Sequence, residues 1–256
     1  MASLNHNKLE IKNLTKKYGE VTALDNISFD VKEGEFLSVL GSSGCGKTTI
    51  LRILVGLLDE TEGKVFKDGE DITDFHPSER SMGIVFQNYA LFQNMTVLEN
   101  IEYAMKIKEE FKGRSREIAE DLIERMGLTA HRNMKPDELS GGQQQRVAIA
   151  RTLALNPEII LFDEPMSALD VDTRLSLRDE IKEIQKEFGT TMVYITHDQE
   201  EAFAMGDRIM VMKAGAIEQI GTPEEIIQHP ESDYIQKFII DNLNVKIESI
   251  IKYVNL

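Results

Sequence analysis

The run of residues 41–48 constrains the fold of this chain more than any other stretch. It reads Gly-Ser-Ser-Gly-Cys-Gly-Lys-Thr, follows the apolar run 36–40 and precedes an apolar-periodic segment. Strand, glycine-rich loop and helix, in that order, are the context in which the pattern G-x-x-x-x-G-K-[ST] binds phosphate. An ordinary glycine-rich turn before a helix is the alternative. We expect this chain to bind a nucleoside triphosphate.

Each part of the loop has a physical reason. Glycines lack a Cβ, so the backbone can curl with its N–H groups around a phosphate, and the helix adds the positive end of its dipole. Lys47 can reach the β- and γ-phosphates, and the Thr48 hydroxyl can ligate Mg²⁺. A thiol at a helix start tends to have a lowered pKa, so we expect Cys45 to react with maleimide unless ATP protects it. The predicted nucleotide-binding residues of this loop are Gly41, Ser42, Ser43, Gly44, Cys45, Gly46, Lys47, Thr48 and Thr49.

Composition limits the possible partners. The 256 residues suffice for one large or two small domains with a sizeable core. A formal net charge of −15 argues against a nucleic-acid partner, because phosphate-binding surfaces need clustered Lys and Arg. The single cysteine excludes an internal disulfide and fits a reducing cytoplasm. The N-terminus is polar and no apolar run reaches about 18 residues, so we expect neither a signal peptide nor a transmembrane helix.

Strand patterns lie on both sides of the loop. Apolar and polar residues alternate over residues 9–31, which predicts a small antiparallel sheet with Tyr18 in its turn. The Tyr18 ring can stack on a purine base, or it can be an ordinary edge-strand tyrosine. Two more short strands are expected within residues 64–86. Gln87 after them can meet Mg²⁺ or the attacking water, or it can be a polar loop residue.

The middle of the chain changes character. From about residue 88 to 156 the pattern is mostly helical, and we interpret it as a helical insertion into an α/β core. Within it, the sequence Leu-Ser-Gly-Gly-Gln at 139–143 directly precedes another helical segment. Ser140 has the residue type of an N-cap, and the glycines leave the first helical N–H groups exposed. This stretch is either a second anion site or an ordinary capped helix start.

Two carboxylates follow the apolar run 159–162. Four consecutive apolar residues fit a parallel strand covered on both faces, and ligands bind at the carboxyl ends of such strands. Asp163 can hold the Mg²⁺ shell there, and Glu164 can polarise a water for in-line attack. His197 follows another expected core strand, where it is either part of a helix cap or a donor to the γ-phosphate.

The remaining segments complete an α/β pattern. Residues 166–170 predict a turn into a long polar helix at about 171–188. Strands near 208–212 and 216–220 and a helix at 222–228 complete the core, whereas 245–254 do not resolve between strand and helix.

In this order the motifs resemble those of the ATPase subunit of an ATP-binding cassette (ABC) transporter, over about residues 9–240. LSGGQ at 139–143, between the glycine-rich loop and IILFDEP, carries the resemblance. The family implies an α/β P-loop NTPase core with an N-terminal antiparallel β-subdomain and an inserted helical subdomain. We place the ATPase domain at 1–242, with its helical insertion at about 88–156, and a C-terminal tail at 243–256.

The resemblance also implies a role for each matched residue. Tyr18 resembles the adenine-stacking aromatic. The residues with implied catalytic roles are Glu164, His197, Lys47 and Gln87. The residues implied to hold Mg²⁺ are Thr48, Gln87 and Asp163. The signature residues, implied to bind the nucleotide of a partner, are Leu139, Ser140, Gly141, Gly142 and Gln143. The residues that resemble the D-loop are Ser167, Ala168, Leu169 and Asp170.

The same resemblance implies cofactors and partners. ATP and Mg²⁺ would be bound by a homodimer, or by two paired ABC subunits, that sandwiches two nucleotides head to tail. Closure would drive separate transmembrane permease subunits, and an importer would add an extracytoplasmic solute-binding protein, with no nucleic acid involved. The implied location is cytoplasmic, peripheral on the inner face of the cell membrane. Residues 197–230 look most like ATPases of bacterial importers for polyamines, ferric iron, quaternary amines or phosphonates, and we expect no further regulatory domain after Leu256.

Three other classes of protein share part of the pattern. An ABC ATPase that serves translation or DNA repair usually has tandem cassettes or a coiled-coil insertion, whereas this chain has one cassette and an acidic balance. A P-loop kinase or GTPase is disfavoured by LSGGQ and by the placement of Gln87 and His197. A catalytically inactive regulatory subunit is disfavoured by Lys47, Glu164 and His197.

Overall fold

The computed structural model describes residues 6–167 and 169–251. The chain divides into two compact units: the first holds the chain up to Asp74 and again from Tyr194, and the second is Phe75–Val193. The domain limits expected from the sequence stay predictions. Within the described ranges, no helix is long and apolar enough to cross a membrane.

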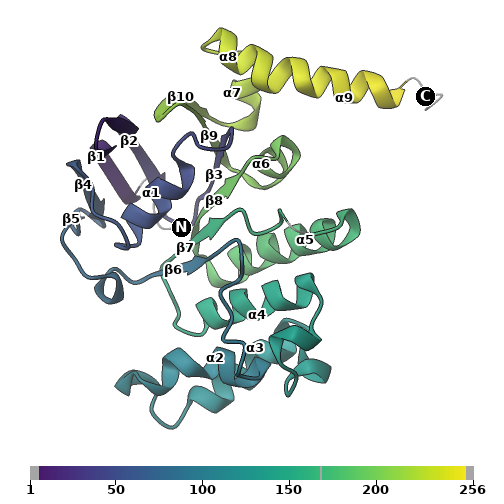
Figure 1. Ribbon diagram of the computed structural model, residues 1–256. Coiled ribbons are helices and arrows are strands. Elements are labelled where there is room, and N and C mark those ends of the chain that lie inside the picture. Colours follow the sequence, from purple (N-terminus) through teal and green to yellow (C-terminus); the bar gives the residue numbers. More distant parts are fainter. Residues whose placement is uncertain (1–5, 168, 252–256) are drawn as a thin grey trace. The chain divides into compact units, whose positions relative to one another are not determined.

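An antiparallel sheet opens the first unit and carries the purple end of the chain in Figure 1. Its strands, in spatial order, are β2 (Val21–Lys32), β1 (Asn7–Tyr18), β4 (Glu62–Lys67) and β5 (Glu70–Asp71). All neighbouring pairs are antiparallel, and the alternation over 9–31 predicts the first of them, β1 with β2. Tyr18 ends β1 and pairs with Val21, so the turn itself consists of Gly19 and Glu20.

A parallel strand pair carries the glycine-rich loop. β3 (Phe36–Gly41) runs parallel to β9 (Arg208–Lys213), and β10 (Ala216–Gly221) is antiparallel on the other side of β9. Every residue of β3 is buried, which explains why its sequence is almost continuously apolar instead of alternating. The loop after β3 leads into α1 (Lys47–Leu54), as expected.

The last part of the first unit is helical. β8 (Thr191–Thr196) carries the chain back from the second unit and is fully buried. The helices after it are α6 (Gln199–Met205), α7 (Pro223–Gln228), α8 (Asp233–Ile235), a π-helical segment (Gln236–Asp241) and α9 (Asn242–Ile251). The sequence left 245–254 undecided; the described part of it, up to residue 251, is helical, and the remainder lies outside the described residues.

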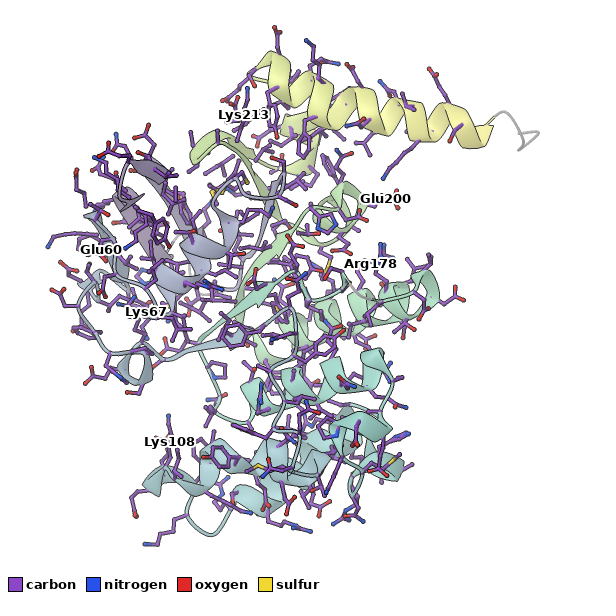
Figure 2. The ribbon with its side chains drawn as sticks, viewed as in Figure 1. Glu60, Lys67, Lys108, Arg178, Glu200 and Lys213 are labelled. Carbon is purple, nitrogen blue, oxygen red and sulfur yellow. The ribbon has the colours of Figure 1, made fainter. Side chains whose placement is uncertain are left out.

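Side chains of α6 hold this C-terminal segment. Gln199 donates from Nε2 to the Phe238 carbonyl oxygen inside the π-helical segment. Lys246 of α9 forms an ion pair with Glu200 at 2.9 Å. The Lys213 ammonium lies 4.7 Å from the centre of the Tyr234 ring; Glu200 and Lys213 are labelled in Figure 2. The end of the described chain is therefore tied to the helix that follows His197.

The second unit combines a short parallel strand pair with helices. β6 (Met82–Val85) runs parallel to β7 (Ile159–Asp163). Its α-helices are α2 (Val97–Lys106), α3 (Ser115–Arg125), α4 (Gly141–Leu153) and α5 (Val171–Phe188). Short 3₁₀ turns lie between α2 and α4, at Glu109–Phe111, Thr129–His131 and Pro136–Glu138, and another precedes β6 at Pro77–Glu79. The predominantly helical character expected for 88–156 is what the structure has there.

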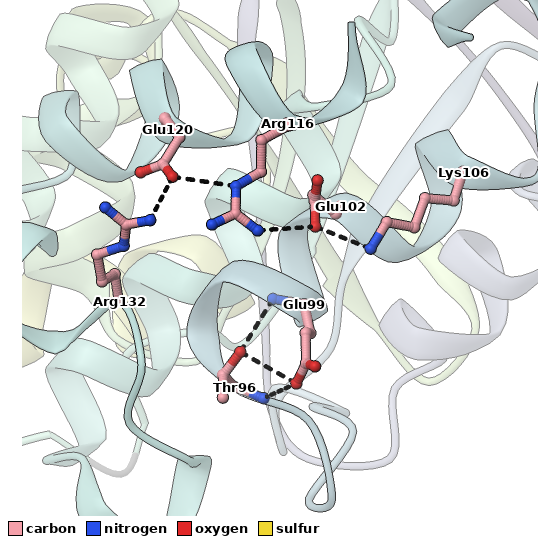
Figure 3. A network of polar contacts seen from close by, with 7 residues as sticks. All are labelled: Thr96, Glu99, Glu102, Lys106, Arg116, Glu120 and Arg132. Carbon is pink, nitrogen blue, oxygen red and sulfur yellow. Dashed lines mark hydrogen bonds and ion pairs between the residues drawn. The ribbon is translucent and has the colours of Figure 1, made fainter. Parts of the chain in front are cut away.

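A polar network ties the helices of this region together (Figure 3). The Thr96 hydroxyl caps α2 by accepting from the Glu99 N–H at 3.2 Å. The buried Glu102 of α2 meets Lys106 at 2.9 Å and Arg116 of α3 at 3.8 Å. Arg116 also meets Glu120 at 3.1 Å, so one guanidinium bridges carboxylates of two helices. A buried carboxylate with two cationic partners is compensated for its lost hydration.

Asn100 of α2 holds the loop between β6 and α2. Its side chain is fully buried, accepts from the Phe92 N–H at 2.9 Å, and donates to the carbonyls of Phe92, Met95 and Thr96 at 3.1, 3.2 and 3.0 Å. We expect Asn100→Ala to lower the free energy of unfolding by about 1–3 kcal/mol, because the Phe92 N–H and the Met95 carbonyl lose the side-chain partner that Asn100 gives them. Urea unfolding measures this, with the exposed Asn94→Ala in the same loop as the control. Equal losses in both variants would contradict this role for Asn100.

Candidate functional site

The Lys47 side chain folds back onto the loop that precedes it. Its ammonium donates to the carbonyl oxygen of Gly41 at 2.7 Å and to that of Ser42 at 3.1 Å. The residue is only 4% exposed, so these carbonyls replace much of the water that a buried ammonium would lose. The end of β3 and the start of α1 are thereby joined through a positive charge.

Glycines let the loop lie close against its neighbours. Gly46 is the N-cap of α1 with φ of +106°, and a Cβ there would lie 2.7 Å from the Ala23 carbonyl oxygen. A Cβ on Gly41 would lie 2.7 Å from the Met212 carbonyl oxygen. Gly44 also has a positive φ, of +80°, but open space around it. A close-packed glycine loop at the start of a helix is the arrangement that fits a phosphate group.

The remaining loop residues differ in exposure. Ser42 and Ser43 are exposed, and Thr48 and Thr49 are half-buried in the first turn of α1. Cys45 is 3% exposed, and its carbonyl oxygen accepts from the Gly215 N–H at 3.1 Å. This burial argues against the maleimide reactivity expected from the sequence, because a thiol must reach solvent to react.

Tyr18 and His197 both present rings on the surface of the first unit. Tyr18 is 50% exposed, with the Lys16 ammonium 5.3 Å from the centre of its ring. His197 is exposed directly after β8. The cap of α6 is Asp198, whose carboxylate accepts from the Glu200 N–H at 2.8 Å. The sequence left open whether His197 is part of a helix cap. The capping residue is its neighbour Asp198.

A buried carboxylate beneath His197 was missed by sequence reasoning. Glu201 is 6% exposed and accepts from the Tyr194 hydroxyl at 2.9 Å and the Thr196 hydroxyl at 2.8 Å. The Thr196 hydroxyl in turn accepts from the Asp198 N–H at 2.9 Å. These contacts bracket the backbone of His197 on both sides. In the sequence Glu201 ends the polar run 196–201, and nothing distinguishes it from an exposed glutamate.

In the second unit the signature residues begin α4. Ser140 is the N-cap, and a reciprocal pair joins it to Gln143: Gln143 N–H to Ser140 Oγ at 3.4 Å, and Ser140 N–H to Gln143 Oε1 at 2.9 Å. This confirms the N-cap predicted from the sequence. A Cβ on Gly142 would lie 2.6 Å from the Thr173 side chain, and one on Gly141 would lie 3.2 Å from that of Leu169. The paired glycines therefore give room for Leu169 and for Thr173 in the first turn of α5.

Hydrogen bonds through Ser167 join Gln87 to the backbone of Glu164. Gln87 donates from Nε2 to the Ser167 hydroxyl at 3.1 Å, and that hydroxyl donates to the Glu164 carbonyl oxygen at 3.0 Å. Glu164 itself has a φ of +46°, which is rare for a residue with a side chain. Asp163 is the buried last residue of β7. Asp170 caps α5 by accepting from the Thr173 N–H at 3.0 Å, whereas Ala168 lies outside the described residues.

Two consecutive left-handed residues follow Gln87, and the sequence contains no glycine to announce them. Tyr89 has a φ of +60° and Ala90 a φ of +46°. Such residues cost on the order of 1–3 kcal/mol each and persist only where surrounding contacts hold them. Arg151 of α4 supplies these contacts by donating to the Tyr89 carbonyl at 3.0 Å and the Ala90 carbonyl at 2.8 Å. Burial lowers the pKa of the Arg151 guanidinium.

The candidate residues thus fall into two groups. The first unit holds Tyr18, the glycine-rich loop 41–49 and His197; the second holds Gln87, the signature 139–143, Asp163, Glu164 and the turn around Ser167. In the parts of the chain that the structure describes, no three His, Cys, Asp or Glu side chains gather as metal ligands. That is compatible with Mg²⁺, which is usually bound by one or two carboxylates together with substrate phosphates.

Comparison with known proteins places these features in a family. Residues 24–167 match the family described as ABC transporter. The chain is 45% identical to the spermidine/putrescine import ATP-binding protein of Roseobacter denitrificans, over 91% of this chain and 64% of that protein. It is 45% identical to the Fe(3+) ions import ATP-binding protein of Photorhabdus laumondii, over 92% and 67%. The spermidine/putrescine import ATP-binding protein of Bacillus cereus is 47% identical, over 93% and 73%.

Solved structures agree on the fold. A dimeric post-hydrolysis state of an ATP-binding cassette bound to ADP and phosphate is similar with a TM-score of 0.74 and 39% identity, covering 84% of this chain and 98% of that one. A second dimeric structure of the same cassette gives a TM-score of 0.75 at 40% identity, with the same coverage. These likenesses confirm the predicted α/β P-loop NTPase fold. The chain spans about two thirds of the length of the first curated relatives.

The two left-handed glycines of the loop provide a matched pair of variants. Gly44→Ala should lower the free energy of unfolding by about 1–2 kcal/mol, the cost of a left-handed alanine. Gly46→Ala should cost at least about 1 kcal/mol more, because its Cβ would meet the Ala23 carbonyl. Urea unfolding of both variants checks this. A smaller loss in Gly46→Ala than in Gly44→Ala would be incompatible with the close approach described above.

Proposed function

This chain belongs to the ABC transporter family, and we propose that it works as the ATP-hydrolysing subunit of a bacterial import system. One observation carries the proposal: a single chain holds both the loop that retains Lys47 and a capped helix that begins at LSGGQ. A phosphate loop alone is common to many NTPases, whereas the two motifs together are a feature of ABC ATPases. ATP is therefore the nucleotide we assign.

We assign the nucleotide to the loop on the first unit. The buried Lys47 ammonium donates to the carbonyl oxygens of Gly41 and Ser42, and a triphosphate would offer it negatively charged acceptors at the same loop. The half-exposed Tyr18 ring offers a face on which adenine can stack. The glycine cradle and the N-terminus of α1 provide backbone N–H groups for the phosphates. These features support the predicted nucleotide-binding role of residues 41–49.

The proposed metal ligands are oxygen donors. Thr48, Asp163 and Gln87 present a hydroxyl, a carboxylate and an amide oxygen, the hard ligands that Mg²⁺ takes, and Mg²⁺ would neutralise charge that develops on the phosphates. We propose Glu164 as the group that polarises the attacking water. His197, exposed and flanked by the Glu201 contacts, would donate to the γ-phosphate. In-line attack of water at the γ-phosphorus then yields ADP and phosphate.

We further propose that two copies, or two paired ABC subunits, act together. The N–H groups at the start of α4 are a second anion-binding feature, and a chain that already has its own phosphate loop can offer them to a partner's nucleotide. The similar cassettes of known structure are dimeric. Permease subunits in the membrane and an extracytoplasmic solute-binding protein would complete the importer, with this subunit peripheral on the inner face of the membrane.

Cargo is proposed to be selected by those other subunits. Relatives named for import of spermidine or putrescine and of Fe(3+) ions are both 45% identical to this chain. An organic polycation and a metal ion differ in size and geometry and need different binding sites, so equal similarity to both supports a cassette that does not contact the cargo. ATP turnover is the function to test in the isolated chain, and Lys47→Ala should abolish it together with most triphosphate affinity.

Glu164→Gln should keep ATP binding while it removes the group that polarises water. We expect turnover to fall at least about 10²-fold, a common effect of losing a positioned general base. Because closure precedes hydrolysis in this proposal, the variant should accumulate as a dimer under saturating Mg-ATP. Steady-state ATPase assays and size-exclusion chromatography measure the two effects. A Glu164→Gln protein that stays monomeric with ATP would count against the nucleotide sandwich.

A pair of heterodimers tests which chain supplies LSGGQ. If sites are shared, Lys47→Ala paired with Gly141→Asp concentrates both defects in one site and leaves the other intact. Wild type paired with the Lys47→Ala/Gly141→Asp double variant instead damages each site once. Asp at 141 adds bulk beside Leu169 and repels a phosphate. We expect the first heterodimer to hydrolyse ATP faster, and the reverse ranking would exclude the head-to-tail arrangement.

A further inference from the structure

We propose that Arg151 is a positioning residue that clamps the loop after Gln87 to the signature helix α4. The inference rests on the proposed function in one respect, the assignment of Gln87 and LSGGQ to nucleotide chemistry. All of the contacts that carry it lie within the second unit.

The clamp is a fork on two consecutive carbonyls. Arg151 Nη2 donates to the Tyr89 carbonyl oxygen at 3.0 Å and Nη1 to the Ala90 carbonyl oxygen at 2.8 Å. These are the two residues with left-handed backbone, φ of +60° and +46°. Adjacent carbonyls can be gripped by one planar guanidinium only in a restricted range of backbone angles. Arg151 therefore stabilises the left-handed backbone of Tyr89 and Ala90, which is unfavourable for these residues on their own.

The surroundings fit arginine and not another cation. The guanidinium also lies 5.5 Å from the centre of the Phe92 ring, and the Phe92 ring packs on Tyr103 of α2 with their centres 4.7 Å apart. Among the described residues, Arg151 forms no ion pair, so its charge serves backbone carbonyls and an aromatic face. A lysine ammonium is a point charge and cannot match a planar fork or stack in the same way.

Tyr89 extends the clamp to the other end of α4. A Cβ on Gly141 would lie 3.8 Å from the Tyr89 hydroxyl oxygen, while the Tyr89 carbonyl is held by Arg151. Gly141 and Arg151 are roughly 15 Å apart along a helix that rises about 1.5 Å per residue. The Tyr89 side chain thus extends toward the signature end of α4, while the Tyr89 carbonyl is held by Arg151 near the other end. Gln87, two residues before Tyr89, and LSGGQ are consequently parts of one stiff piece of structure.

This arrangement has a mechanistic consequence. In the proposed dimer, Gln87 would serve the nucleotide on its own chain and LSGGQ the nucleotide on the partner. A stiff connection between them means that a displacement at one nucleotide is passed to the other through Tyr89 and α4. Loss of Arg151 should leave ATP affinity nearly unchanged and lower turnover, because a misplaced catalytic group costs rate before it costs binding.

The test asks whether relief of the backbone conformation makes Arg151 dispensable. Ala90 is exposed, so Ala90→Gly removes little packing and keeps the carbonyl, while glycine adopts a positive φ at no steric cost. We expect Arg151→Met to lower kcat about tenfold with the KM for ATP within about twofold. Ala90→Gly in that background should recover at least about threefold in kcat. Arg151→Lys serves as a second starting point if the methionine variant does not fold.

The matched control is Ala214→Gly. Ala214 has a φ of +47° in the turn between β9 and β10, so the same substitution relieves the same kind of backbone strain elsewhere. Recovery by Ala90→Gly and not by Ala214→Gly supports the clamp. Equal recovery by both, or recovery by neither, overturns it, because Arg151 would then act through general stability or through its charge.

A nucleotide-free measurement separates this inference from the proposed function. Amide hydrogen exchange of residues 86–92 should be about tenfold faster in Arg151→Met than in wild type and should slow again when Ala90→Gly is added. Unchanged exchange in Arg151→Met would refute the clamp even if ATP turnover falls. A wild-type chain without ATPase activity would refute the proposed function and leave the exchange result to decide on Arg151.

Discussion

A buried ammonium group with carbonyl partners organises the first unit. Lys47 is retained by oxygens at the end of β3, and it stands at the first position of α1. Strand end, loop and helix start must therefore stay in one relative position for the charge to remain solvated. Gly41 and Gly46 also hold the loop in this position. Neither has a Cβ, so the backbone of β9 can pack closely against Gly41 and that of β2 against Gly46. The contacts of Lys47 therefore determine both the shape of the candidate site and the local fold around it.

The candidate residues of the second unit are also held in position by their neighbours, with fewer charged groups involved. These residues lie at strand ends, in turns and at helix caps, and hydrogen bonds of 3.1 and 3.0 Å join Gln87, Ser167 and the backbone of Glu164. Three residues close to this chain of contacts, Tyr89, Ala90 and Glu164, have left-handed backbone without being glycine. Stored strain of this kind is typical of sites whose side chains must point in a set direction.

Much of the fold could be predicted because single residues carry local signals. The alternation before the loop predicted β1 and β2, Ser140 predicted the start of α4, and the bounds of the helix at 171–188 were predicted as well. Cys45, Glu201 and Ala90 show where such reasoning stops. The burial of Cys45, the inward direction of Glu201 and the backbone angle of Ala90 are each decided by residues distant in the sequence. Residues 245–251 were left undecided for a different reason, because the order of apolar and polar positions there does not distinguish a strand from a helix.

The π-helical turn at Gln236–Asp241 determines how α9, which follows it, is rotated about the helix axis. In such a turn each hydrogen bond spans one residue more than in an α-helix, so a carbonyl such as that of Phe238 is open to an outside donor, here Gln199. One residue more or less rotates everything downstream by about 100° around the helix axis. The extra residue therefore acts as an angular spacer, which turns Lys246 toward Glu200. An insertion or deletion in this short stretch would rotate the whole of α9, whereas a substitution within it would change only local contacts.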